Sequence, residues 1–250
     1  MKKSVWIITF EATQNTIFFQ KNKQQANTAY KSHIAELEAR SLRAQMNPHF
    51  IFNALNSVNS FISENDQRSA NKFLTSFSRL MRLVMENSEY DFISTQKELE
   101  ILEIYLELEH FRFKDKFDYK INVDDSLDDD FEIPPMLIQP YIENAIWHGL
   151  RYKENSGNLT LQLTKKEKKL HVTISDNGIG RTASAEESEK YNKTHKSFAT
   201  QIMKQRIDIF NYYNNYELSF NIEDLYDDKG KPSGTAVTLM IPLDFKSREK

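Results

Sequence analysis

Three short stretches in the second half of the chain carry residues that could bind a ligand or a metal ion. The first is ENAIWHG at 143–149, in which Asn144 and His148 stand four positions apart. On a helix this spacing places both side chains on one face, and the amide oxygen of Asn144 is a ligand that Mg²⁺ accepts. We expect Gly149 to end the helix in a left-handed cap. By itself, the stretch favours a capped surface helix.

The second stretch is DNGIG at 176–180, directly after a predicted strand. An aspartate at the end of a strand can accept a hydrogen bond from an amino group, and the glycines let the backbone approach a flat ligand closely. A hairpin turn is the alternative, but a long polar segment follows here in place of a partner strand. The third stretch, Gly234-Thr235, enters the last predicted strand and indicates little alone.

A histidine in the first half of the chain could act as a nucleophile. It lies in QMNPHFIFNALNSVNSFI at 45–62, which is amphipathic at 3.6 residues per turn. The polar face consists of His49, Asn53, Asn56 and Ser60, and the apolar face of Ile51, Leu55, Val58 and Ile62. Pro48 indicates that a helix begins here or that a longer helix kinks. His49 is the single ionisable group on its face, and a neutral imidazole is a competent nucleophile.

A second amphipathic helix follows the polar turn at 63–67. Its apolar positions are Phe73, Leu74, Phe77, Leu80, Met81 and Val84. Two helices joined by a short turn form a helical hairpin, whose apolar faces cannot all be covered by the two helices alone. Dimerisation into a four-helix bundle would cover them, and packing against another domain is the alternative.

A third helix is expected to begin at a capping box, because Thr95 and Glu98 have the required types and spacing. This helix reaches His110 or beyond. Its glutamates are expected to form a solvated face, and they are Glu98, Glu100, Glu103, Glu107 and Glu109.

Beyond residue 113 the pattern changes to short alternating segments. Strands are predicted at 117–124, 159–166, 170–176, 216–224 and 235–243, helices at 133–150 and 198–213, and a polar lid at 181–197. This order is typical of an α/β sandwich, with helices layered on one face of a mixed sheet. The fold class is therefore predicted as α+β, a helical hairpin followed by an α/β sandwich.

The composition excludes several classes of function. The chain has no cysteine, which excludes disulfides, a thiol nucleophile and cysteine-ligated zinc. A net charge of −3 gives no indication of direct binding to nucleic acid. The stretch VWIITF at 5–10 is far shorter than the ~20 apolar residues that span a bilayer. We therefore expect no transmembrane segment.

The motifs in this order resemble a known family. From about residue 114 to 243 the chain resembles the ATP-binding domain of the GHKL (Bergerat) family, which includes gyrase, the Hsp90 chaperone, histidine kinases and MutL. ENAIWHG is similar to its N box, DNGIG to its first glycine box, and Gly234-Thr235 to the sequence of its adenine pocket. NPHF at 47–50 and IPPMLIQPYIENAIWHGL at 133–150 are similar to LytS/YehU-like sensor histidine kinases.

This resemblance implies a two-component histidine kinase that uses ATP and Mg²⁺ and passes its phosphoryl group to a response-regulator aspartate. His49 would be the phospho-acceptor, Asn144 would hold Mg²⁺, and Glu143 and His148 would lie near the γ-phosphate. Asn53, one turn beyond His49, could orient the imidazole or the phosphate. The implied nucleotide-binding residues are Asn144, Asp176, Asn177, Gly178, Gly180, Lys196, Thr200 and Thr235. Asp176 would bind the adenine amino group, with Thr235 supporting it through water.

One departure from the family concerns the second glycine-rich stretch, which cradles the triphosphate. Here that stretch is HKSFAT at 195–200, with Ala199 where glycine is expected. Lys196 and Thr200 could still contact phosphate, and activity is expected to be reduced. A catalytically weak or inactive dimeric scaffold is therefore the alternative function, and an ATPase or serine kinase on the same fold is a third.

The resemblance also implies an organisation and partners. Residues 1–28 are expected to form a lead-in, 29–112 the dimerisation and phospho-acceptor helices, and 113–250 the ATP-binding domain. The expected partners are a second copy of the chain, a LytTR-type DNA-binding response regulator and a membrane-bound sensor. The expected location is the bacterial cytoplasm or the inner face of the cell membrane.

Overall fold

The computed structural model describes residues 48–114, 116–125, 127, 131–184, 204–205, 207–208, 210–211 and 217–243. The chain forms two compact units, 1–55 and 56–250. Of the first unit only residues 48–55 are described, and they form the first half of helix α2. Within the described residues, no helix has both the length and the apolar character needed to cross a membrane.

A helical hairpin comes first, as predicted. Helix α2 (Pro48–Ser63) leads through a tight turn into α3 (Gln67–Asn87). Asp66 caps α3 by accepting a hydrogen bond from the Ser69 N–H at 3.0 Å. Inside the second unit, the Phe61 ring lies 5.9 Å from that of Phe73 and 5.1 Å from that of Phe111, between ring centroids. Aromatic packing therefore joins the last turn of α2 to α3 and to the following helix, residues 95–112.

Helix α4 (Thr95–Arg112) begins one residue earlier than the predicted capping box requires. Its N-cap is Ser94, whose hydroxyl accepts from the Lys97 N–H at 3.3 Å. Thr95 lies inside the helix, and its hydroxyl donates to the Phe131 carbonyl at 2.8 Å. The capping-box prediction is therefore wrong, because both of its side chains bond to residues more than 30 positions away.

Glu98, the other half of that predicted box, is fully buried. Its carboxylate accepts hydrogen bonds from the backbone N–H groups of Met136 at 3.0 Å and Ile138 at 3.3 Å. Met136 has a φ of +58°, a conformation that few residues with a side chain adopt. The prediction of a solvated glutamate face is wrong for Glu98 and for Glu109, which is 1% exposed. Glu103 and Glu107 are exposed as expected.

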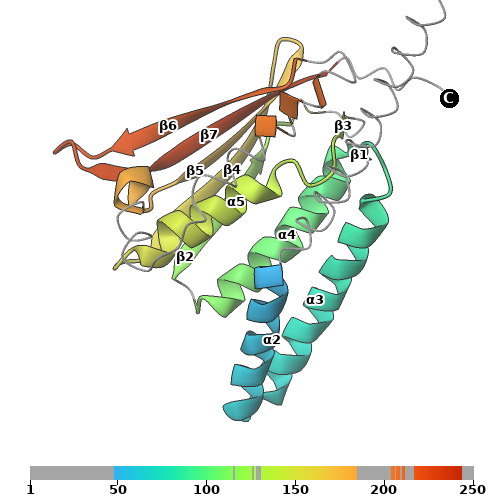
Figure 1. Cartoon of the computed structure of the whole chain (residues 1–250), viewed down its shortest axis with the longest axis vertical. Helices are drawn as coiled ribbons and strands as arrows, with labels where there is room; N and C mark the ends of the chain where they lie inside the picture. The colour runs from blue at the N-terminus through green and yellow to red at the C-terminus, as the bar shows by residue number, and fades with distance from the viewer. Residues whose placement is uncertain are drawn as a thin grey trace, which may run out of the picture. The chain divides into compact units, whose positions relative to one another are not determined.

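The second half of the chain builds a five-stranded sheet in the order β2-β4-β5-β7-β6 (Figure 1). The strands are β2 (Phe117–Val123), β4 (Gly157–Lys166), β5 (Lys169–Asp176), β6 (Ser219–Tyr226) and β7 (Pro232–Pro242). β2 and β4 are parallel, and the other neighbours are antiparallel. All five predicted strands are present, and β4 and β5 form the expected hairpin through residues 167–168. A short pair, β1 (Ile93–Ser94) with β3 (Glu132–Ile133), lies apart from this sheet.

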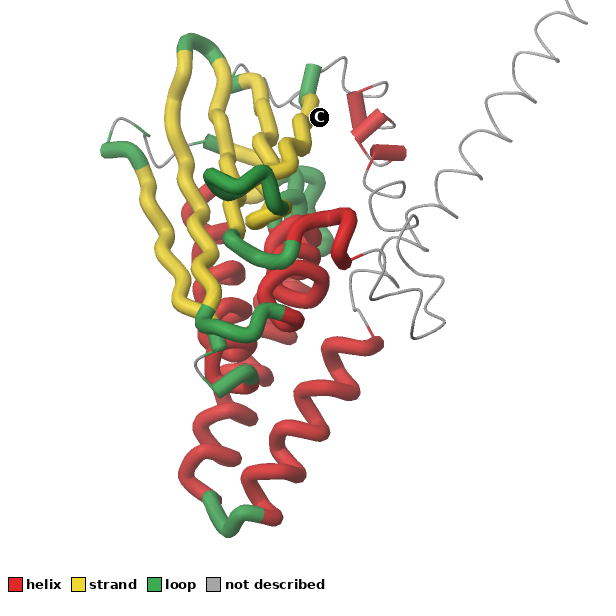
Figure 2. The backbone as a smooth tube through the Cα atoms, turned by 90° about the vertical axis from the view of Figure 1, so that its left-hand side faces the viewer, coloured by secondary structure: helices red, strands yellow, loops and turns green. Residues whose placement is uncertain are grey.

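The sheet buries one face only, which is why its strands alternate in sequence. Every second side chain of β5 is buried and the others are partly exposed. Helices α4 and α5 (Gln139–Asn144) lie on the same side of the sheet, so the helices form one layer and the strands the other (Figure 2). The predicted α/β sandwich is confirmed. Its core includes Ile142, Ile146, Leu161, Val172 and Leu239.

The predicted helix at 133–150 is much shorter than expected. Residues 135–138 form a turn and a bend, and α5 covers only Gln139–Asn144. The chain continues as a π-helical turn η1 (Ala145–Gly149) and a 3₁₀ turn η2 (Leu150–Tyr152). Apolar spacing cannot distinguish these backbone types, because all three bury similar side chains. Of the helix predicted at 198–213, the described residues 204–205, 207–208 and 210–211 are helical. Residues 181–184 of the region predicted as a polar lid are also helical.

Replacing Glu98 with alanine should destabilise the second unit. Two buried backbone N–H groups would lose their acceptor, so Glu98→Ala should lower the free energy of unfolding by ~2–4 kcal/mol. Glu103→Ala, an exposed site on the same helix, should change it by less than ~0.5 kcal/mol. Urea denaturation followed by circular dichroism measures both, and equal losses would contradict the role given to Glu98.

Candidate functional site

The three motifs singled out in the second half of the chain meet around the side chain of Asp176. This residue ends strand β5 and is 5% exposed. Its carboxylate accepts a hydrogen bond from the backbone N–H of Gly178 at 2.8 Å, and Thr235 lies opposite Asp176 in the register of β5 and β7. Gly149, the last residue of ENAIWHG, lies against the Asp176 carboxylate, because η1 packs on β5 and β7.

Glycine is required at this meeting point by close contact between backbones. A Cβ on Gly149 would lie 2.8 Å from Asp176 Oδ1, and one on Gly178 would lie 2.5 Å from Gly149 Cα. A Cβ on Gly234 would lie 1.9 Å from the Asp176 carbonyl oxygen. The predicted left-handed cap at Gly149 is wrong: its φ is −100°, and the chain continues helically into η2. Gly149 lacks a side chain because there is no room for one.

The loop after Asp176 is tied to the sheet by its own backbone and side chains. Asn177 Oδ1 accepts the Asn158 N–H at 2.7 Å, and the Asn177 carbonyl accepts from Lys153 Nζ at 2.8 Å. Gly180 has a φ of +74°, where a side chain would be strained. The Asn177 side chain therefore anchors the loop in this structure, although the sequence predicts it as a ligand contact.

Burial raises the pKa of the Asp176 side chain. Removal from water raises its pKa to about 6, while the Gly178 N–H, Lys153 and the Thr235 N–H act in the opposite direction. At pH 7 the carboxylate is therefore mostly ionised and is a strong hydrogen-bond acceptor. This geometry suits a ligand that presents an amino group to the end of β5.

Asn144 and Glu143 close helix α5, where the backbone changes from α to π geometry. The Leu150 N–H bonds to the Ala145 carbonyl five residues earlier, and such π turns are frequent at functional sites. Glu143 Oε1 accepts from Gln139 Nε2 at 3.0 Å. His148 is half-buried within the π turn. Asn144 is the last residue of α5 and His148 lies in the π turn, and their predicted placement on one face stays a prediction.

The remaining predicted site residues belong to other segments of the chain. His49 and Asn53 are one turn apart in α2, in the first unit of the chain. Lys196, Ala199 and Thr200 lie outside the described residues. No group of three acidic or histidine side chains that could hold a metal ion occurs in the described part of the chain.

Sequence reasoning missed two residues that support the site. Lys153 bonds to the loop carbonyl at Asn177, and nothing local indicates that contact, because the two are 24 residues apart. Gln139 lies four residues before Glu143, so a helical reading of 139–143 could have found this pair.

Sequence comparison identifies relatives of this chain. Residues 37–117 match a family model described as histidine kinase. The sensor protein LytS of Oceanobacillus iheyensis is 38% identical over 150 residues, which are 60% of this chain and 25% of that protein. LytS of Staphylococcus saprophyticus is 31% identical over 224 residues, which are 87% of this chain and 36% of that protein. The chain thus spans about a quarter to a third of the length of these relatives.

Solved structures offer a weaker likeness. The mycobacterial sensor histidine kinase MprB is 13% identical, with a TM-score of 0.40 over 60% of this chain and 97% of that chain.

Asparagine at position 176 should change how stability depends on pH. The folded-state pKa of Asp176, about 6, lies above the ordinary 3.8, so wild-type stability falls as the pH rises from about 4 to 6. Asp176→Asn does not titrate. The free energy of unfolding of the variant minus that of wild type should therefore rise by on the order of 2 kcal/mol between pH 4 and pH 6 and then level off.

Denaturant unfolding at several pH values measures this change. Asp224→Asn is the control with the opposite sign, because Arg181 lowers the pKa of Asp224. If the difference in stability between Asp176→Asn and wild type does not vary with pH, burial does not raise the pKa of Asp176.

Proposed function

This chain belongs with the LytS-like sensor histidine kinases, and we propose that it moves the γ-phosphoryl group of Mg-ATP to His49 and then to an aspartate of a response regulator. The observation that carries this proposal is the convergence of three sequence motifs on one buried carboxylate, Asp176. The family match over residues 37–117 supports it from the other half of the chain, because that segment contains His49.

Asp176 is proposed to bind the adenine amino group. It is buried, mostly ionised at pH 7, and approached closely by backbone at Gly149, Gly178 and Gly234. Adenine presents one amino group at its edge, and a carboxylate oxygen is its natural acceptor. Gly178 and Gly180 would let the following segment leave the pocket without a clash.

The phosphate end of the ligand is assigned to the residues around the π turn. Asn144 would hold Mg²⁺ together with phosphate oxygens, since this ion commonly takes few protein ligands. The bound ion would neutralise charge on the phosphates. Glu143 and His148 are assigned places near the γ-phosphate.

In the transfer step, an imidazole nitrogen of His49 forms a bond to the γ-phosphorus. The bond from that phosphorus to the bridging oxygen breaks, and ADP leaves with the electron pair. Such transfer depends on positioning and charge neutralisation more than on covalent machinery. Asn53, one helical turn beyond His49, is proposed to orient the imidazole.

Several finer points complete the proposal. Lys196 and Thr200 would contact phosphate, and Ala199 in place of glycine would reduce turnover, so Ala199→Gly should raise it. The response regulator would be of the LytTR type. The chain would work in the cytoplasm or at the inner face of the membrane, with a membrane-bound sensor as its source of signal.

Labelling with γ-³²P-ATP and Mg²⁺ tests the central step. We expect label on His49 that is stable to base and lost in acid, as for a phosphohistidine, and no label in His49→Gln. His171→Gln is the matched control, because His171 lies on the sheet face away from the helices and should label as wild type does. Labelling of His49→Gln at the wild-type level would show that the acceptor is another residue.

A second copy of the chain is proposed to pack on α3. One face of α3 is buried, with Phe73, Leu80 and Val84, but a second apolar stripe is not. Leu74 is 45% and Met85 60% exposed on this stripe. An open groove of about 740 Å³ lies along it, lined in part by Phe77, Met81 and Met85. Ile62 of α2, 57% exposed, adds to the apolar surface of the hairpin. A four-helix bundle formed by two hairpins would cover such surface.

The double variant Leu74→Lys/Met85→Lys should convert a dimer into a monomer, because each lysine would place a charge in the apolar interface. Light scattering after size exclusion measures the mass. Tyr226→Lys, at a side chain that is also 60% exposed but lies on β6, should leave the mass unchanged. A wild-type chain that is monomeric at all concentrations would exclude this dimer.

A further inference from the structure

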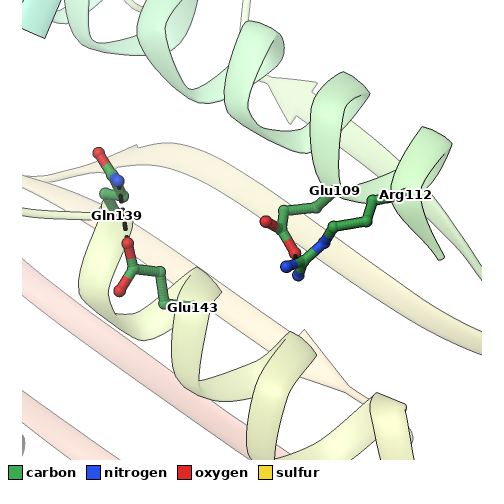
Figure 3. Close-up of polar contacts among 4 residues, drawn as sticks. All are labelled: Glu109, Arg112, Gln139 and Glu143. Carbon is green, nitrogen blue, oxygen red and sulfur yellow. Dashed lines mark hydrogen bonds and ion pairs between the residues drawn. The ribbon is translucent and has the colours of Figure 1, made fainter. Parts of the chain in front are cut away.

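Helix α4 carries an ion pair that is buried against the N-box segment 143–149. Glu109 and Arg112 lie three residues apart and form a salt bridge, with side chains 1% and 11% exposed. Figure 3 shows the pair between α4 and α5, on the same side of α5 as Glu143 and Gln139. Burial raises the pKa of Glu109 to about 7, although Arg112 acts in the opposite direction.

The guanidinium of Arg112 is held in an aromatic corner. Its central carbon lies 4.5 Å from the ring centroid of Phe113 and 4.3 Å from that of Trp147. The two rings are 5.6 Å apart and nearly perpendicular. Arg151 lies 5.0 Å from the Trp147 centroid as well. A flat, delocalised cation suits such a site better than an ammonium group does.

Trp147 is the middle residue of the π turn η1. A π turn is rare and is less favourable than continued α-helix, so contacts outside the helix must hold it. On the sheet side Gly149 supplies such contacts, through its closeness to Gly178 and through the Ile179 N–H, which donates to its carbonyl at 3.3 Å. On the α4 side the contacts are those of Arg112 and of Phe113, the residue after α4, with the Trp147 ring.

We propose that Arg112, oriented by Glu109, is a positioning residue that holds Trp147 and thereby keeps the π turn in the shape that carries Asn144 and Gly149 to the site at Asp176. This inference rests on the proposed function for its kinetic consequence. Its structural consequence, an ordered turn at 145–149, stands without it.

The Glu109–Arg112 ion pair is better explained by its role in positioning Trp147 than by a contribution to folding stability. Replacing a buried ion pair with apolar side chains of similar volume is often neutral or stabilising, whereas removing one partner leaves a buried charge alone. The informative variant is therefore the double change Glu109→Leu/Arg112→Met, which keeps the packing volume and removes both charges. Arg112→Lys keeps the charge and removes the flat surface.

Arg79→Met is the matched control. Arg79 also pairs with a glutamate of α4, Glu100, at 2.5 Å, but both side chains are about half exposed and neither lies in the aromatic corner. Removing that pair should leave the π turn and the kinetics unchanged.

The experiment measures deuterium uptake of a peptide covering 143–149 and, on the same protein samples, kcat and KM for ATP. In the double variant and in Arg112→Lys, uptake at 145–149 should rise. The kcat should fall roughly tenfold to a hundredfold, as expected when a catalytic group is misplaced. The KM should stay within about threefold, because Asp176 is untouched. Thermal unfolding of the double variant near the wild-type temperature separates this effect from a loss of fold.

The outcomes separate the two proposals. Unchanged deuterium uptake in both variants would overturn the positioning role, as would full rescue of kcat by Arg112→Lys, which would show that charge alone matters. If wild type does not label His49 at all, the proposed function is overturned, and the positioning role is then decided by deuterium uptake alone.

Discussion

The site depends on one steric constraint: three backbone segments pass the Asp176 side chain and its strand end at distances that exclude a Cβ. The π turn arrives at Gly149, the loop leaves at Gly178, and β7 enters at Gly234. Close contact removes water from the carboxylate and raises its pKa to about 6. The same contact requires the helical layer to be held firmly against the sheet at this point.

Helix α4 helps to hold the segment around α5 against the sheet through two buried carboxylates near the ends of α4. Glu98 accepts two backbone N–H groups just before α5, and Glu109 holds Arg112 against Trp147 just after it. The segment between them contains Glu143 and Asn144. Since α4 also packs on α3, it connects the hairpin to the proposed ATP-binding half.

Sequence patterns located the elements well where burial is one-sided. All five strands were predicted because alternating residues face the helices, and α3 because its buried positions recur at helical spacing. The motif residues were found through their types and order. The shape of 133–150 was missed, since turns, α-helix and π-helix bury the same apolar residues. Glu98 and Glu109 were assigned to solvent, since a charged residue on a helix is usually exposed.

The sequence by itself determined the alternating strands, the amphipathic hairpin, and the presence of an Asn, an Asp and several glycines in the order of a nucleotide-binding family. These features are local, so the spacing and type of neighbouring residues record them. Only the tertiary structure decided that Gly149 is a site of close approach rather than a left-handed cap, and that two glutamates of α4 are buried. The contacts of Gly149 and of Glu98 join residues about 30 to 40 positions apart. Glu109 is buried because its partner Arg112 packs against Trp147 of the segment after α5. No local sequence pattern contains that information.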